Sequence, residues 1–300
     1  MTRQPPMTTA SDLTLDHVMI AVRDMDEAIR SYRAIGFNVQ RGGRHPGRGT
    51  ENAVMRFDWE YFELIAVHDP AERALLGEEG AGLTKFLEQR VGGLVDPVFS
   101  TSTLDTLLAQ FASAAVAVTG PVRLQRVRPD GIVVANRCFQ PGGRMSTRQL
   151  YPGFIQWDAQ DPERLSGEWA GTHENGARGV AGLALVVADL DRARSAYLGV
   201  LGLRPEAEDS VPELGARRLR CRSGRLAIDL LTPTGPGPAL TELREIGEGP
   251  FEPTLRVADL ERTRSRLTSA GVEMQPAPGI IDGWLLPTDC TVGTRLVLVE

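Results

Sequence analysis

One short pattern recurs four times along this 300-residue chain. An apolar, strand-like run leads to Asp or Thr at a helix N-cap position, and apolar residues at helical spacing follow. The capping residues are Asp24, Thr103, Asp189 and Asp259, which lie 79, 86 and 70 residues apart. Repeats of this length mark one supersecondary unit each, so four copies constrain the fold more than any single residue does.

The clearest copies are LDHVMIAVRDMDEAI at 15–29, VAGLALVVADLDRAR at 180–194 and GPFEPTLRVADLERTR at 249–264, and LVDPVFSTSTLDTLL at 94–108 is a fainter one. After each predicted helix comes a stretch of β-type composition with Gly and Pro turns, long enough for three strands. The repeat therefore predicts an α+β fold of four βαβββ modules. The polar segment 158–179 is the natural boundary between an N-terminal half, 13–157, and a C-terminal half, 178–300.

Charge and cysteine usage restrict the class of protein. Lys and Arg number 33 against 39 Asp and Glu, giving a net charge of −6, which argues against nucleic acid or a membrane surface as partner. The three cysteines form no CxxC pair, as is typical of a reducing compartment. No signal peptide and no apolar run long enough to span a membrane is visible, so we expect a cytoplasmic protein.

Three segments of the first half and one between the halves indicate a family. They are LDHVMIAVRDMDEA, GGRHPGRGTENAV at 42–54, YFELIAV at 61–67 and HENGA at 173–177. Together with the four modules they resemble the vicinal oxygen chelate superfamily of glyoxalases, bleomycin-resistance proteins and extradiol dioxygenases, and in particular its bacterial glyoxalase-like domain group. The resemblance implies that the modules pair into two cup-shaped mixed sheets.

The resemblance also implies a metal centre built from the first and last strand of each module. Carried onto this sequence, those positions are His17, Glu63, Asp96 and Gln156 in the first half. Imidazole and carboxylate ligands suit a divalent ion such as Zn, Ni, Mn or Fe, and no organic cofactor is implied.

In the second half the same positions are Gly182, Asp229, Glu252 and a residue near Val297. This half contains no histidine, so we expect a degenerate site there. Extradiol dioxygenases of the superfamily hold iron with two histidines and a carboxylate in their C-terminal half. That activity is therefore disfavoured.

Each candidate ligand has a structural alternative. His17 alternates with Met19 along one strand face, as a core histidine would. Glu63 is more informative because a carboxylate within an apolar run is costly to bury unless it is paired or metal-bound. Asp96 precedes a proline and is equally suited to a strand start, whereas the side chain of Gln156 points away from those of its neighbours.

The glycine-rich loop of the first module and two other positions predict substrate contacts. Arg44 and Asn52 flank the loop, and guanidinium groups match anionic or carbonyl oxygen. Arg128, although it lies in a predicted turn, and Trp157 complete the predicted substrate-binding set. A solvated hairpin whose glycines merely permit positive φ is the alternative for the loop. His45, on the same loop, is a candidate for moving a proton together with Glu63.

Two functions fit these features. The first is a glyoxalase-like lyase or isomerase, in which a divalent metal chelates a small oxygenated substrate and stabilises an enolate or similar oxyanion. The second is a metal-free small-molecule binding protein of the bleomycin-resistance type. Both predict a small-molecule partner and leave a homodimer open.

Overall fold

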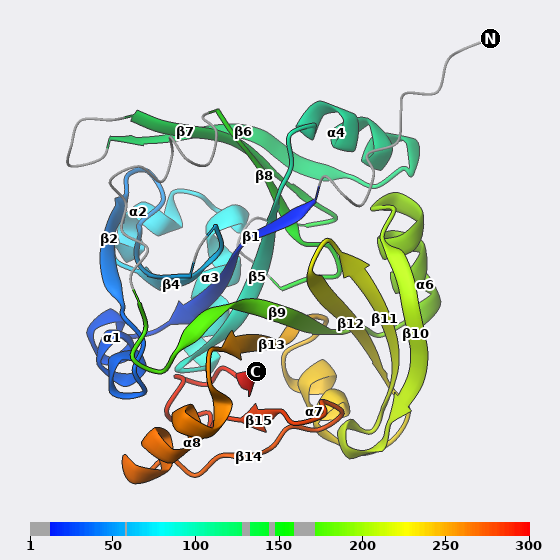
Figure 1. Ribbon diagram of the computed structural model, residues 1–300. Helices are drawn as coiled ribbons and strands as arrows, with labels where there is room; N and C mark the ends of the chain where they lie inside the picture. Colours follow the sequence, from blue (N-terminus) through cyan, green and yellow to red (C-terminus); the bar gives the residue numbers. More distant parts are fainter. Residues whose placement is uncertain (1–12, 58, 128–132, 144–147, 159–171) are drawn as a thin grey trace.

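The computed structural model describes residues 13–57, 59–127, 133–143, 148–158 and 172–300. Within them the chain forms two eight-stranded mixed sheets flanked by helices (Figure 1). The strand orders are β2-β3-β4-β1-β5-β8-β7-β6 and β10-β11-β12-β9-β13-β16-β15-β14. Each sheet thus contains two modules joined along their first strands, which confirms the predicted α+β fold of paired βαβββ modules.

The first sheet consists of β1 (Thr14–Val22), β2 (Gln40–His45), β3 (Thr50–Arg56), β4 (Tyr61–Val67), β5 (Gly92–Ser100), β6 (Val118–Val127), β7 (Val133–Pro141) and β8 (Gly153–Trp157). Its helices are α1 (Met25–Ala34), α2 (Pro70–Ala74), α3 (Glu78–Gln89) and α4 (Leu104–Ser113). β1 and β5 pair antiparallel at the centre, and each pairs parallel with the last strand of its own module, β4 or β8.

The second sheet consists of β9 (Ala177–Val186), β10 (Arg204–Val211), β11 (Ala216–Ser223), β12 (Leu226–Pro233), β13 (Gly249–Val257), β14 (Gln275–Pro276), β15 (Trp284–Leu285) and β16 (Val297–Val299). Its helical segments are α6 (Leu190–Arg194), η1 (Ser195–Val200), η2 (Pro212–Leu214), α7 (Pro238–Glu245) and α8 (Leu260–Ser269). The pairing of β9 with β12 and β13 repeats that of β1 with β4 and β5.

The predicted helix caps hold in three of the four modules. Asp24 accepts a hydrogen bond from the backbone N–H of Glu27, and Asp189 and Asp259 cap α6 and α8 in the same way. Thr103 lies at the N-cap position of α4, but its side chain makes no capping hydrogen bond. The weak repeat signal of the second module therefore corresponds to a real module with a weaker cap.

A helix packs on the concave face of each sheet. Leu83 and Leu87 of α3 join an apolar cluster with Met19, Ile65 and other residues of that face, and Figure 1 shows α3 within the curve of the first sheet. In the second sheet Ala239 of α7 has the same role. The opposite faces of both sheets share a larger apolar core with the module helices. The first concave surface is therefore apolar where α3 packs on it.

A buried ion pair joins the two halves. Arg148, which precedes β8, lies 2.7 Å from the carboxylate of Glu242 on α7. The same guanidinium donates to the carbonyl oxygen of Leu94 at 3.0 Å and to that of Pro250. Burial lowers the pKa of Arg148 to about 10, and the nearby carboxylate partly opposes this shift. The interface between the halves thus contains a buried, charged arginine paired with a carboxylate.

His173, in the HENGA segment, is buried as a neutral histidine. Its Nδ1 accepts the backbone N–H of Asn38 at 3.0 Å, so its Nε2–H donates to the carbonyl oxygen of Arg56, also at 3.0 Å. The rings of Phe37 and Phe57 pack against it. These contacts tie the segment between the halves to the first module.

The buried imidazole of His173 predicts a loss of stability in mild acid. Burial lowers its pKa below the usual value of 6.5, so the unfolded chain binds the proton more tightly than the folded one. The contribution is complete above pH 6.5 and is lost as the pH falls from there. Urea unfolding between pH 5 and 8 should show this decline, and His173→Gln, which cannot titrate, should reduce it. An unchanged slope in that variant would contradict the assignment.

No helix among the described residues is long and apolar enough to span a membrane.

Candidate functional site

A β-bulge in β1 shapes the candidate site. The register between β1 and β5 shifts between Leu15 and His17, which leaves Asp16 as the extra residue. Neighbouring residues of a regular strand point to opposite faces, but the bulge lets the side chains of Asp16 and His17 meet. His17 Nδ1 lies 2.7 Å from Asp16 Oδ1, and both residues are buried.

The other ring nitrogen of His17 faces a second carboxylate. His17 Nε2 lies 3.5 Å from Glu63 Oε2 on β4. The imidazole stacks on the ring of Tyr61, with centroids 4.8 Å apart and an angle of 18° between the planes. The guanidinium carbon of Arg56 lies 4.6 Å from the centroid of that tyrosine ring. The imidazole thus has a carboxylate beside each nitrogen and an aromatic ring on one face.

Two further predicted residues converge on Glu63. Asn52 Nδ2 donates to Glu63 Oε1 at 2.6 Å, while Asn52 Oδ1 accepts the backbone N–H of Gly43 at 3.0 Å. His45 Nε2 lies 4.0 Å from the same carboxylate oxygen, and its Nδ1 lies 2.9 Å from Thr50 Oγ1. The side chain of His45 is 35% exposed and that of Glu63 is 10% exposed. His45 therefore connects a buried carboxylate with the surface.

Glycines of the glycine-rich segment allow Asn52 to lie close to the backbone of β2, and this segment also carries His45 and Arg44. A Cβ at Gly42 would collide with Asn52 Oδ1, so the close approach of this amide requires glycine there. Arg44 is exposed and pairs with Glu51 of β3, whereas His45 pairs with the neighbouring residue, Thr50. Because adjacent strand residues alternate, Arg44 lies on the face opposite His45. The structure does not bring Arg44 to the predicted site.

The second module contributes differently from the expectation. Trp157 Nε1 donates to Asp16 Oδ2 at 2.7 Å, so its indole N–H is bonded to protein and not directed at a substrate. Gln156 lies on the other face of β8, and its amide donates to the carbonyl oxygen of Ser102 at 2.9 Å. The assignment of Gln156 as a metal ligand is therefore corrected, because strand alternation takes it away from His17.

Strand register identifies the true counterpart of Glu63. Glu63 pairs with Met19 in the first module, and in the second module the matching pair is Gly153 with Val98. Glycine supplies no ligand atom. A Cβ at Gly153 would lie 2.8 Å from Gln140 Oε1, so the side chain of another strand fills this space.

Asp96, the remaining predicted ligand, is buried on β5 opposite Met19. Strand partners share a face, so Asp96 lies on the side of the sheet that carries His17. Its Oδ2 lies 3.4 Å from where a Cβ of Gly153 would be. Within the described part of the chain, no group of three or more His, Cys, Asp or Glu side chains is arranged to hold a metal ion. The donor set implied by the resemblance is therefore not assembled.

Arg128, which the sequence predicts to contact the substrate, lies outside the described residues.

In the second half, the carboxylates at the corresponding positions are hydrogen-bonded to arginine side chains. Asp229 accepts two hydrogen bonds of 2.7 Å from Arg220, and Glu252 accepts one of 3.0 Å from Arg295. Burial raises the pKa of Glu252, and the guanidinium beside it opposes this shift. With Gly182 at the position equivalent to His17, both carboxylates here are paired with arginine side chains.

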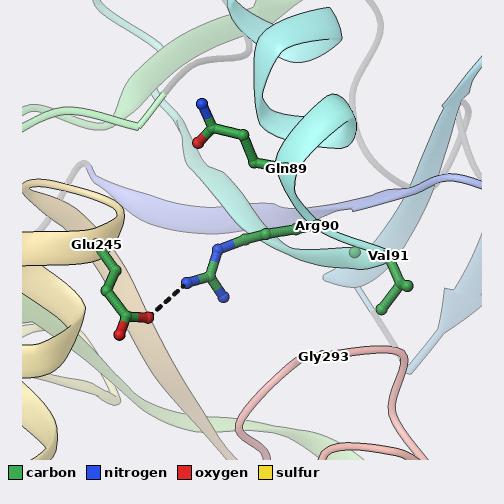
Figure 2. A pocket seen from close by; sticks show the side chains of 6 residues that line it. Gln89, Arg90, Val91, Glu245 and Gly293 are labelled. Atoms are coloured by element: carbon green, nitrogen blue, oxygen red, sulfur yellow. Dashed lines mark hydrogen bonds and ion pairs between the residues drawn. The ribbon is translucent and has the colours of Figure 1, made fainter.

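A separate cleft of about 470 Å³ opens between the halves (Figure 2). It is lined by Gln89, Arg90, Val91, Gly92, Glu245 and Gly293. Arg90 and Glu245 face each other across it, with nitrogen and oxygen 3.4 Å apart. None of the predicted site residues lines this cleft.

The structure thus defines a protein of two paired-module sheets with one histidine–glutamate centre. The sequence model described as a glyoxalase-like domain matches residues 15–201, more than half of the chain, so the protein belongs to this family. A second model, for the glyoxalase, bleomycin-resistance protein and dioxygenase superfamily, matches residues 183–284. No curated protein matches the sequence significantly.

Solved structures share the fold over the whole chain. A hypothetical protein from Staphylococcus aureus has a TM-score of 0.67 at 14% identity, covering 96% of this chain and 99% of its own. A mutant of 4-hydroxymandelate synthase from Streptomyces coelicolor has a TM-score of 0.66 at 13% identity, covering 96% and 92%. At these identities the likeness concerns the fold alone.

Proposed function

We propose that this protein is an enzyme that moves a proton on a small oxygenated substrate, with Glu63 as the group that exchanges the proton. The observation that supports this most is the convergence of His17, His45 and Asn52 on the carboxylate of Glu63. A buried carboxylate with other titratable side chains close to it is a common arrangement for a general base.

The proposed reaction begins at a carbon next to a carbonyl group. Glu63 takes the proton from this carbon, and the electron pair of the broken C–H bond moves to the carbonyl oxygen, which gives an enolate. Glu63 then gives the proton to the neighbouring carbon, which was the carbonyl carbon. A hydroxyl group on the first carbon passes its own proton to the enolate oxygen and becomes the new carbonyl group, so the outcome is the isomerisation of a 2-hydroxy carbonyl compound. His45, which is partly exposed, carries protons between Glu63 and solvent.

A divalent metal, implied by the resemblance, does not fit the arrangement of donors. Gly153 offers no ligand, and the side chain of Gln156 lies on the other face of its strand. No step of the proposed reaction is therefore assigned to a metal.

A binding protein is the second candidate, and one observation favours it. Tyr61 stacks on His17, and Trp157 donates to the carboxylate beside it, so two aromatic side chains surround the centre. Such rings hold small ligands without any chemistry.

The experiment uses the purified protein in D₂O with a panel of small 2-hydroxy and 2-oxo carbonyl compounds. Proton NMR should show the signal of the hydrogen next to the carbonyl disappearing faster with the protein than without it. Ligands that raise the melting temperature of the protein but exchange no hydrogen would overturn the enzyme proposal in favour of binding.

A further inference from the structure

We propose that Asp16 is a positioning residue that fixes the tautomer and orientation of His17, and that Trp157 of the second module holds Asp16 in place. This inference rests on the proposed function of the same site. It gives the second module a role at the centre, because that module supports the histidine and supplies no ligand.

The two oxygens of Asp16 have different donors from different modules. Oδ1 lies 2.7 Å from His17 Nδ1, and Oδ2 accepts the indole N–H of Trp157 at 2.7 Å. Asp16 is only 2% exposed, so water competes little for these bonds. A carboxylate clamped from both sides cannot rotate without losing a hydrogen bond in a buried setting, which is costly.

The contact with Asp16 determines which nitrogen of His17 carries the proton. An ionised carboxylate only accepts hydrogen bonds, so Nδ1 must be the donor. This leaves Nε2 without a proton, 3.5 Å from Glu63 Oε2, where it accepts a hydrogen bond once that carboxylate has taken the proton from the substrate. The stacked ring of Tyr61 limits tilting of the imidazole. The Asp16 contact therefore presents a defined nitrogen to the proposed base.

The bulge supports a dedicated role for this contact. Without it Asp16 would point to the opposite side of the sheet from His17, where the apolar core lies. A bulge costs one unpaired position in the central strand pair and re-aims a side chain. Here the re-aimed side chain is the one that contacts the histidine.

The test compares Asp16→Asn and Trp157→Phe with the wild type by ¹⁵N–¹H NMR of the histidine side chains at one fixed pH. Asparagine has one acceptor oxygen and cannot serve both donors, whereas Trp157→Phe keeps an aromatic ring but removes the N–H. We expect a protonated Nδ1 at His17 in the wild type. In Asp16→Asn the population should shift towards a protonated Nε2, with a smaller shift in Trp157→Phe.

Two controls make the readout specific. Trp59→Phe changes an exposed tryptophan between β3 and β4, and it should leave His17 unchanged. The Nε2–H of His173 reports that the fold is intact in each variant. An unchanged His17 tautomer in both site variants, with His173 unchanged, would overturn the proposal. If Asp16→Asn does not fold, Trp157→Phe decides alone.

Activity separates this inference from the proposed function. If the function holds, the hydrogen-exchange rate should fall about 10- to 100-fold in Asp16→Asn, the usual loss when an outer residue that orients a site histidine is removed. A tautomer shift in a protein that never exchanges hydrogen would support the positioning role and reject the enzyme.

Discussion

Glu63→Gln is expected to lower the rate of hydrogen exchange at the substrate carbon by about 10²- to 10⁴-fold, the usual contribution of a general base. The amide keeps the size of the side chain and still offers an oxygen to Asn52, but it cannot take up a proton. The rate is measured by proton NMR in D₂O on the substrate that the wild type exchanges fastest.

The second half offers a matched control for this substitution. Asp229 occupies the position in β12 that Glu63 occupies in β4, since each pairs with the equivalent residue of the first strand. Asp229→Asn should leave the exchange rate within about twofold, because its carboxylate is bonded to Arg220 and takes no part in the proposed reaction. Equal losses in the two variants would contradict a centre confined to the first half.

Arg148→Met is expected to reduce the free energy of unfolding by about 3–5 kcal/mol, the usual cost of removing one partner of a buried ion pair. The substitution leaves Glu242 buried without its guanidinium and removes the donor to two backbone carbonyls at the interface. Urea unfolding followed by fluorescence and circular dichroism measures the change.

The matched control is the double variant Arg148→Met with Glu242→Gln. Burial raises the pKa of Glu242, and the charge of Arg148 is the strongest influence that opposes this rise. When the arginine is lost, the buried carboxylate therefore remains without a compensating charge. Removing both charges should therefore restore part of the stability. A single variant as stable as the wild type would show that the halves do not depend on this pair.

The modules could be predicted because the pattern that defines them is local. A cap such as Asp24 and the apolar spacing after it depend on a few neighbouring residues, and the same signal recurs four times. His17 and Glu63 could be located because the family resemblance assigns both to fixed strand positions, and the structure places them 3.5 Å apart. His45 and Asn52 could be proposed from a glycine-rich loop next to those strands.

The support of the centre could not be predicted because it depends on strand register. A single extra residue in β1 moves Asp16 to the face of His17, whereas the apolar pattern of this segment predicts a regular strand. The family resemblance predicts the closing position of the second module at Gln156, but the pairing of β5 with β8 assigns it to Gly153. Adjacent aspartate and histidine in LDHV are the one hint that the sequence offered.

Hydrogen exchange by chelator-treated protein tests the central claim most directly. The purified wild type is stripped of divalent ions, its metal content is measured, and its exchange rate in D₂O is compared with that of Glu63→Gln treated in the same way. The proposed centre predicts that the stripped wild type keeps its activity while Glu63→Gln has lost it. Activity that disappears on stripping and returns with one equivalent of metal, but not when the metal is added to His17→Ala, would contradict it.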